Sequence, residues 1–364
     1  LYNAPGLPIS WNKNQYQEGT NEYVAVRPEL KKQIEELYRK HPEEARDSFG
    51  EDSFEVKNIL KYWVFSEKPE FHVIPTDTIN IHIDKDALLR SGIMLPKTIR
   101  HLKGEDLKDA IPDKLYIPLT DIRMLTKVDL LMLEMLANCN WERPLYLAIS
   151  VGSVSKLKFD NYFVQEGLAF RFTPFDYKKW GDVGENRLYA VDVERLYDNV
   201  MNRYKYGGLD TPGLYLDETT LRTCWYHRRL FAQLAKELIA QGDNERAKKV
   251  LAYAEQVIPG YNVPETHESG SYDIATAYAA LGEKTKAVTL AVHLIAEAED
   301  YINWAFSLKG NRIEMVRNDC IYKFWQWNQC NELLKKVDEE SYKESNRRFE
   351  DKYALFAPNM GYKN

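Results

Sequence analysis

The 364-residue sequence lacks any long apolar run. None approaches the ~18 consecutive apolar residues that a membrane-spanning helix needs, and the first residues do not read as a signal peptide. The chain begins with Leu1. We therefore expect a mature form or an excised part of a longer protein, with any targeting or anchoring segment outside these residues.

Residues spaced for metal or nucleophilic chemistry are also lacking. The four cysteines form no CxxC pair, which argues against a zinc site. Cys320 and Cys330 fall on different faces of one predicted helix, so we favour free buried thiols. The histidines lack ligand spacing, and there is neither a GxSxG elbow nor a phosphate-binding loop. We predict no catalytic residue, no metal and no cofactor.

An excess of basic charge is absent as well. Lys and Arg number 49 against 55 Asp and Glu, which gives a net charge of −6. This balance makes nucleic acid a poor partner. Aromatic residues, by contrast, are abundant, with 24 Tyr, 14 Phe and 8 Trp. Tyr and Trp are favoured at recognition surfaces, although many of these rings must fill the core.

The most informative pattern lies in residues 231–259, which have the spacing of a tetratricopeptide repeat. Gly242 and Asp243 make the turn between two helices, and small residues sit where the backbones approach. A weaker copy follows in residues 274–294. Such repeats usually build concave binding surfaces and seldom carry chemistry, so the pattern predicts recognition. The matching positions are Phe231, Leu234, Ala235, Leu238, Ala247, Leu251, Ala254 and Pro259.

The first part of the chain predicts helices after an extended lead-in of about 25 residues. Pro28 opens one helix, and Asp52 with Glu55 forms a capping box for a second. Thr126 caps a third helix. Its predicted apolar stripe is Val128, Leu131, Met132, Met135 and Leu136.

Strands alternate with these helices. Ile79, Ile81 and Ile83 alternate with polar residues, which predicts a strand with one wet face. Residues 114–119 and 167–174 predict two more strands. Residues 144–151 are almost wholly apolar, which predicts a strand covered on both faces.

The predicted fold class is α+β. It comprises an extended lead-in with helices (residues 1–66), an α/β domain (67–205) and a helical tetratricopeptide-like domain (206–364).

Several segments together resemble one known family. Residues 140–148 (NWERPLYLA) resemble a W-x-R-P-[IL]-Y-[FL]-A strand, and residues 166–174 (EGLAFRFTP) resemble EGLAYRLVP. Residues 206–209 (YGGL) and 214–218 (LYLDE), followed by Arg222, resemble WGGLN…VYIDE…R. In this order, the motifs are similar to the C-terminal soluble region of a bacterial multi-spanning membrane-protein family. That family was long filed as of unknown function and is related to protein O-mannosyltransferases.

The resemblance implies a non-catalytic domain on the extracytoplasmic, periplasmic face of the inner membrane. Its partners would be the membrane half of the same polypeptide, of the lipid-linked-sugar glycosyltransferase type, and an acceptor protein or glycan. The family's catalytic acid lies in that membrane half. Two alternatives stay open: a free-standing extracytoplasmic glycan- or protein-binding module, and a hydrolase whose site has no recognised motif.

Five residues are candidate binding residues. Arg222, Tyr226 and Arg229 share one helix face, and two cations around a ring suit a carboxylate-bearing peptide or an anionic glycan. The alternative is that they pair with nearby acids and fix a domain junction. Arg143 could grip a carboxylate or phosphate. We favour a structural pair between Arg143 and a nearby acid such as Glu142 or Glu166.

Three other groups have a structural and a functional interpretation. Asp217 and Glu218 point to opposite sides of an extended segment, so we expect a helix cap and no acid–base pair. Residues 227–229 (His-Arg-Arg) form either a solvated face or a basic strip that reads anionic groups. Trp325 and Trp327, with Phe324, either cap the helical core or form a platform on which sugars stack.

Overall fold

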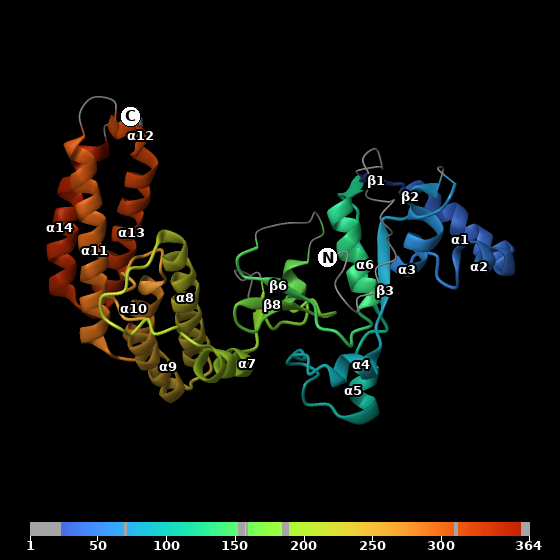
Figure 1. Ribbon diagram of the computed structural model, residues 1–364, viewed down its shortest axis with the longest axis horizontal. Helices are drawn as coiled ribbons and strands as arrows, with labels where there is room; N and C mark the ends of the chain where they lie inside the picture. The colour runs from blue at the N-terminus through green and yellow to red at the C-terminus, as the bar shows by residue number, and fades with distance from the viewer. Residues whose placement is uncertain are drawn as a thin grey trace. The chain divides into compact units, whose positions relative to one another are not determined.

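The protein is seen in a computed structural model that describes residues 23–68, 71–151, 157, 159–183, 189–308 and 312–357. Most of the predicted lead-in lies outside these residues. The fold is α+β, as predicted, with several small sheets followed by an all-helical region (Figure 1). The chain forms two compact units, Leu1–Asp192 and Val193–Asn364.

The first unit mixes short helices and short strands. Pro28 opens the first helical segment, as its position predicts. The helices are α1 (Lys31–Lys40), α2 (Pro42–Phe49), α3 (Val56–Ile59), α4 (Lys85–Arg90), α5 (Gly104–Ala110) and α6 (Lys127–Asn138). The strands are β1 (Tyr23–Val26), β2 (Val73–Ile74), β3 (Thr78–His82), β4 (Lys114–Pro118), β5 (Met124–Thr126), β6 (Tyr146–Ala148), β7 (Phe163–Gln165), β8 (Ala169–Phe172) and β9 (Ala190–Val191).

These strands form three small sheets within the described residues. Strand β1 lies between β2, which is parallel to it, and β5, which is antiparallel. Strands β3 and β4 form an antiparallel pair. The third sheet has the order β6-β8-β7-β9, in which only β7 and β9 are parallel. The strands predicted near residues 79–83, 114–119 and 167–174 are therefore confirmed.

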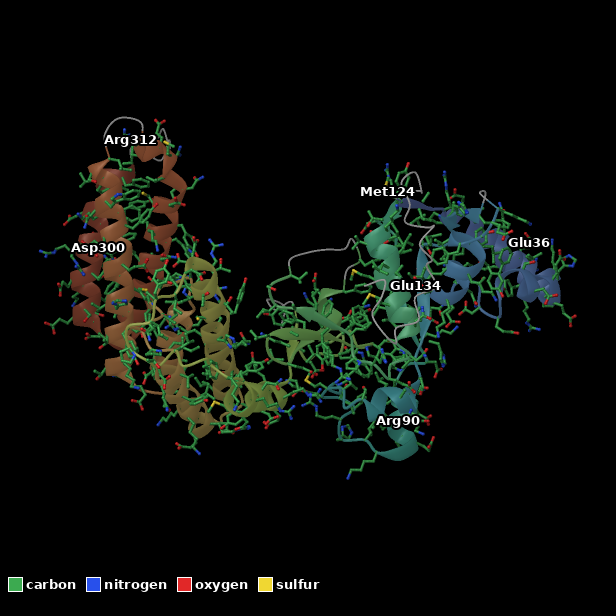
Figure 2. The ribbon with its side chains drawn as sticks, in the orientation of Figure 1. Glu36, Arg90, Met124, Glu134, Asp300 and Arg312 are labelled. Atoms are coloured by element: carbon green, nitrogen blue, oxygen red, sulfur yellow. The ribbon has the colours of Figure 1, made fainter. Side chains whose placement is uncertain are left out.

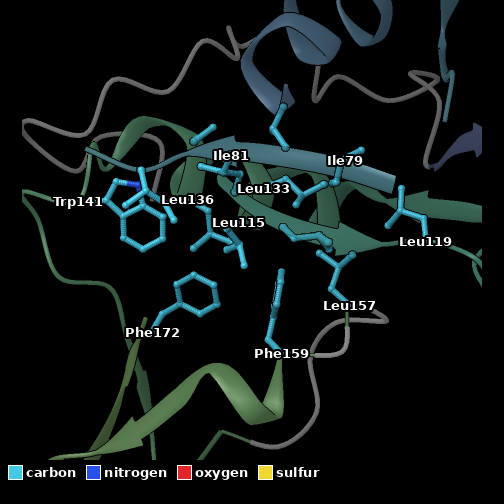
Figure 3. Close-up of a cluster of buried hydrophobic side chains, with 14 of the residues drawn as sticks. Ile79, Ile81, Leu115, Leu119, Leu133, Leu136, Trp141, Leu157, Phe159 and Phe172 are labelled. Atoms are coloured by element: carbon cyan, nitrogen blue, oxygen red, sulfur yellow. The ribbon is translucent and has the colours of Figure 1, made fainter. Parts of the chain in front are cut away.

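One hydrophobic core joins these pieces. Isoleucines of β3, Leu115 and Ile117 of β4 and apolar residues of α6 gather in this core, together with the rings of Trp141, Phe159 and, from β8, Phe172 (Figure 3). The labelled members include Ile79, Ile81, Leu115, Leu133, Leu136, Trp141, Phe159 and Phe172. Ile79 and Ile81 of β3 are buried, as the period of two along that segment predicts, and Asn80 between them is buried as well.

Two local predictions in this unit were wrong. Asp52 does not cap a helix: its carboxylate accepts from the backbone amide of Phe54 and binds Lys114 at 2.5 Å. Glu55 occupies the N-cap of α3 without a side-chain bond. The face of β3 that was predicted to be exposed to solvent is also partly buried. Asn80 is only 5% exposed, and its backbone N–H donates to the backbone carbonyl of Phe54.

Helix α6 confirms its cap and corrects its stripe. Thr126 and Asp129 form a reciprocal capping box. The buried face, however, runs through Leu130, Leu133 and Leu136, whereas Val128 is 50% exposed. The helix is apolar over so much of its surface that spacing alone does not fix which side faces the core.

The prediction of a doubly covered strand over residues 144–151 was wrong. Only Tyr146–Ala148 forms a strand, and β6 lies at the edge of its sheet. Tyr146 is 48% exposed and Val151 39% exposed. A short apolar run cannot by itself distinguish a central strand from an edge strand.

The second unit is helical throughout its described residues. Figure 1 shows α11, α13 and α14 running alongside one another, in agreement with their contacts. Asp300 marks α11 and Arg312 marks the start of α12 in Figure 2. The helices are α7 (Val193–Asp198), α8 (Glu218–Ala240), α9 (Asn244–Val257), α10 (Ser271–Ala280), α11 (Lys284–Ser307), α12 (Arg312–Met315), α13 (Arg317–Val337) and α14 (Glu339–Phe356).

Helices in this unit pack as successive pairs. The pairs are α8 with α9, α10 with α11, and α13 with α14, and α8 also contacts α10. Gly242, at φ 80°, makes the first turn, and Asp243 caps α9 by accepting from Arg246 N. Ala235 and Ala247 are both fully buried. The small residues therefore lie inside the unit, where a close approach of two backbones requires them.

Ala247 provides a direct test of this packing. We expect Ala247→Trp to destabilise the chain by about 3 kcal/mol, because a fully buried methyl group leaves no room for an indole. The measurement is urea unfolding followed by circular dichroism. The matched control is Ala296→Trp on α11, where the side chain is exposed and we expect a change within about 0.5 kcal/mol. Equal unfolding of the two variants would contradict the helix register.

Candidate functional site

Arg228 of α8 is a buried cation of the helical unit and is only 3% exposed. Its guanidinium donates to the carbonyls of Ile258 (3.1 Å), Val263 (2.5 Å) and Pro264 (2.8 Å) and to Ser269 Oγ (3.0 Å). Ile258 is the C-cap of α9, where backbone carbonyls lack helical partners and attract positive charge. Arg228 thus holds both ends of the loop between α9 and α10.

Neither interpretation of residues 227–229 is correct, because these residues are neither a solvated face nor a strip. Burial lowers the pKa of Arg228 to about 10, which keeps its side chain charged at neutral pH. His227 is half-buried between the rings of Tyr204 and Tyr206, and burial lowers its pKa. Only Arg229 is exposed. Three consecutive helical residues span about 200° of the helix circumference, so they meet different surroundings.

Glu268, in the same loop, connects helices α8 and α13. Its backbone carbonyl accepts from Nε of Arg229 at 2.8 Å and from Nη2 of the same residue. Its carboxylate accepts from Gln326 Nε2 at 2.7 Å and from Lys323 Nζ at 3.3 Å. Burial opposes ionisation of Glu268, but the bonds from Gln326 and Lys323 outweigh it and lower the pKa of the carboxyl.

Next to Glu268, four rings form a corner. Tyr322 and Trp325, one turn apart on α13, stack with centroids 5.4 Å apart and planes at 17°. His267 and Tyr272 stack in the same way at 5.2 Å and 14°. The two pairs meet edge-on, since the rings of His267 and Trp325 lie 5.3 Å apart at 60°. Tyr322 is 45% exposed and Trp325 47% exposed, so much of this corner is open to solvent.

We call this surface the Glu268 face. It comprises residues from α8, from α10, from α13 and from the loop before α10: Tyr226, Arg229, His267, Glu268, Tyr272, Tyr322 and Trp325. The guanidinium of Arg229 also lies 5.7 Å from the ring centre of Tyr226. Burial lowers the pKa of His267, so its ring is neutral at pH 7. The face therefore combines open ring surfaces with compensated charges.

The structure brings together two of the three predicted α8 residues. Tyr226 and Arg229 both belong to the Glu268 face, whereas Arg222 lies further towards the start of α8 and pairs with Glu218 at 2.5 Å. Asp217 is the N-cap of α8 and accepts from Thr220 N at 2.9 Å, which confirms the predicted cap.

The other two predicted residues, Arg143 and Glu166, lie in the first unit. Glu166 does not pair with Arg143. It faces Arg171 of β8, with 3.6 Å between Oε1 and Nη1, and both side chains are buried. Arg171 also donates to Ser91 O at 2.9 Å, which ties the third sheet to the end of α4. Arg143 is exposed on the chain that leads into β6, so the favoured structural pair was assigned to the wrong arginine.

The aromatic residues of α13 divide between core and surface. Trp327 is fully buried and donates to Ser345 Oγ on α14 at 2.8 Å, and Phe324 is 3% exposed. Both pack against α14, for example through Phe349. Trp325 faces solvent instead. Of the two interpretations of this segment, core packing therefore holds for Trp327 and Phe324, and an open ring surface remains at Trp325.

His267 and Tyr272 were missed from the sequence. His267 lies in a loop without periodicity, and Tyr272 occupies the first turn of α10, so neither shows a helical face on its own. The sequence signal that could have pointed to this loop is the glycine at position 270, whose φ of 88° is one that glycine adopts readily. A Cβ there would lie 2.8 Å from Arg229 Cγ, so the loop must press closely against α8.

The first unit contains one notable cleft, of about 540 Å³. It is lined by residues of both signs, including Asp52, Lys57, Asp84, Lys114 and Glu142. The backbone at its wall is unusual, because Asn140 and Trp141 adopt φ of 48° and 60°. Asp52 and Lys114 are already paired, and Lys57 binds Asn140. Much of the cleft's polar capacity is thus used internally.

The described ranges contain neither a cluster of metal ligands nor a helix that could span a membrane. No group of three or more His, Cys, Asp or Glu in that part of the chain could hold a metal ion. None of the described helices is both long and apolar enough to cross a membrane. All four cysteines are buried and unpaired with one another.

Comparison with known proteins gives one match. The family model described as TMEM260-associated domain 2 matches residues 1–194, which is more than half of the chain. No curated protein and no solved structure matches.

Arg228 should be irreplaceable for stability. We expect Arg228→Lys to lower the free energy of unfolding by about 3 kcal/mol, because one ammonium cannot satisfy four oxygens that a planar guanidinium reaches. Urea unfolding measures the loss. Arg222→Lys is the control, since Arg222 is exposed and its loss of stability should stay within about 0.5 kcal/mol. Similar values for both variants would refute the role assigned to Arg228.

Proposed function

The chain belongs to the TMEM260-associated domain 2 family, and from this premise we propose that it is the non-catalytic, extracytoplasmic part of a membrane-embedded glycosyltransferase. The parent protein would be related to protein O-mannosyltransferases. Residues outside this chain would supply the membrane-spanning half and the catalytic acid. The helical unit, with tetratricopeptide-like pairs, would engage the acceptor protein or its glycan on the periplasmic side.

Two lines of support bear on the parent protein. The family match covers residues 1–194, the region that contains the W-x-R-P and EGLAYRLVP-like motifs. Those motifs fall on β6 and β8, which pair with each other in one sheet. The motifs therefore lie in one structural element of the first unit, which favours a shared architectural role over a catalytic one.

The carboxylates singled out as candidates support a non-catalytic role. Glu166 is buried against Arg171, Asp217 caps α8, and Glu268 is held by Lys323 and Gln326. A general acid or base must be free to exchange a proton with a substrate. Each of these groups is instead engaged in a hydrogen bond or an ion pair within the protein.

The observation that carries the recognition role is the Glu268 face. It presents the exposed rings of Tyr322 and Trp325 on α13 and the exposed cation of Arg229 on α8, with the partly buried Tyr272 of α10, and these helices belong to successive pairs. Tyr, Trp and Arg are the residues that contribute most often to binding hot spots. Repeat helices commonly expose such groups on one continuous surface, where an extended chain can lie across several of them.

The purified chain should transfer and release no sugar. We expect no product when it is incubated with a lipid-linked sugar and an acceptor peptide, or with nitrophenyl glycosides, because the candidate carboxylates are each engaged within the protein. Mass spectrometry and absorbance provide the measurements. Sugar release that disappears when an acid of this chain is changed to its amide would refute the non-catalytic assignment.

The α8 residues should matter for the acceptor. In the full-length protein we expect Arg222→Ala/Tyr226→Ala/Arg229→Ala to weaken acceptor binding roughly tenfold or more. Glycan occupancy of extracytoplasmic proteins, measured by glycopeptide mass spectrometry in cells that carry the variant, should fall accordingly. The control is Lys248→Ala/Lys249→Ala, which also removes exposed cations but from α9.

Thermal unfolding of the isolated variant separates recognition from folding. Reduced occupancy with unchanged unfolding supports the proposal. Lower melting with normal occupancy supports the alternative, in which these side chains only fix local structure through Glu218 and Glu268.

A further inference from the structure

The aromatic corner of the Glu268 face has a geometry that suits one class of ligand. Its stacked pairs, Tyr322 with Trp325 and His267 with Tyr272, stand at a steep angle to each other. An open corner of this kind can cover the apolar face of a ring-shaped ligand and leave the ring's edge to the polar groups beside it. The two exposed rings lie on α13. Two neighbouring residues of the same helix, Phe324 and Trp327, are buried in the core and hold the helix in place.

The polar groups beside the corner are balanced in charge. Lys323 Nζ lies 2.8 Å from Glu297 and 3.3 Å from Glu268. Arg229 binds the Glu268 carbonyl on the other side. Two cations and two carboxylates thus compensate one another, so the face offers little net charge to attract a charged ligand.

Planar amides complete the rim. Gln329 Oε1 lies 3.2 Å from His267 Nε2, and its backbone carbonyl accepts from Tyr272 OH at 3.3 Å. Gln326, 2% exposed, binds Glu268 through its amide nitrogen, while its Oε1 has no partner among the described residues. Gln326 Oε1 is enclosed by the protein, so the amide open to a ligand beside the rings is that of the partly exposed Gln329.

We propose that the corner formed by His267, Tyr272, Tyr322 and Trp325 is a binding subsite for a neutral hexopyranose. One face of such a ring carries C–H groups that pack on an aromatic surface, and its edge carries hydroxyls that bond to amides and carboxylates. The compensated charges match a neutral ligand better than an anionic or cationic one. The inference deepens the proposed function at the same face and rests on it for the role, although not for the chemistry.

The geometry also explains why Trp304 does not form a second such site. Trp304, on α11, is 49% exposed and lies near Tyr301, much like Trp325 beside Tyr322. Those two rings are tilted by 57°, however, and no second stacked pair is found beside them among the described residues. Trp304 is therefore a matched control, with equal exposure and no corner.

The test is a titration of the isotope-labelled chain with methyl glucopyranoside, methyl galactopyranoside and methyl mannopyranoside, followed through the indole N–H signals by NMR. We expect at least one hexoside to shift the Trp325 signal in a saturable way and to leave the Trp304 signal unmoved. Trp325→Ala and Tyr322→Ala should each weaken binding roughly tenfold, since each removes one ring surface. Trp304→Ala should bind as the unchanged chain does.

Three outcomes would overturn the inference. They are no shift at Trp325 with any of the three neutral hexosides, equal shifts at Trp325 and Trp304, or tighter binding of methyl glucuronide than of methyl glucopyranoside. The titration of the unchanged chain decides the matter even if a variant fails to fold. It needs no acceptor protein, so its failure is distinct from failure of the α8 variant in cells.

Discussion

The structure of the helical unit depends on the buried guanidinium of Arg228. A charge in a dry interior is costly unless it is hydrogen-bonded, and here three backbone carbonyls and one hydroxyl accept from Nη1 and Nη2 of Arg228. Those acceptors belong to residues 258–269, so the interaction fixes a loop that has no secondary structure of its own. These hydrogen bonds offset the desolvation cost of the cation, and they also order that loop. The same loop then presents His267 and Glu268 to neighbouring helices.

The position of the loop is fixed a second time by close contact. Gly270, in the left-handed region, is the N-cap of α10, and Arg229 packs so closely against it that a Cβ at this position would clash. The backbone carbonyl of Glu268 can then accept from Arg229, and its carboxylate can accept from Lys323 and Gln326 of α13. Each step limits the next: Arg228 places the loop, Gly270 sets its distance from α8, and Glu268 joins two helices. The exposed rings keep their mutual angles because their supports are buried.

Local patterns in the sequence predicted what local forces decide. The capping of α6 and α8 and the turn at Gly242 depend on neighbours a few residues away, and all were found from spacing. Interaction partners that lie far apart in the sequence could not be predicted from local spacing. Arg171, the partner of Glu166, also bonds Ser91, 80 residues earlier in the chain, and Arg228 meets residues 258–269, across a helix pair. For the same reason, Tyr226 and Arg229 were predicted from their helix face, while His267 and Tyr272, which depend on loop placement, were missed.

The division of the chain bears on how recognition can be built. The hydrophobic core of the first unit gathers residues from Val24 to Ala190, and none of its members comes from the helical unit. The interactions that form the Glu268 face all lie between residues 226 and 329. The face therefore needs no residue of the family-matched region for its internal geometry. Residues 1–194 define the family, whereas the surface available for binding is organised by an arginine outside that region. The motifs in that region fall on two strands that pair with each other, and none of the rings of the Glu268 face lies among them.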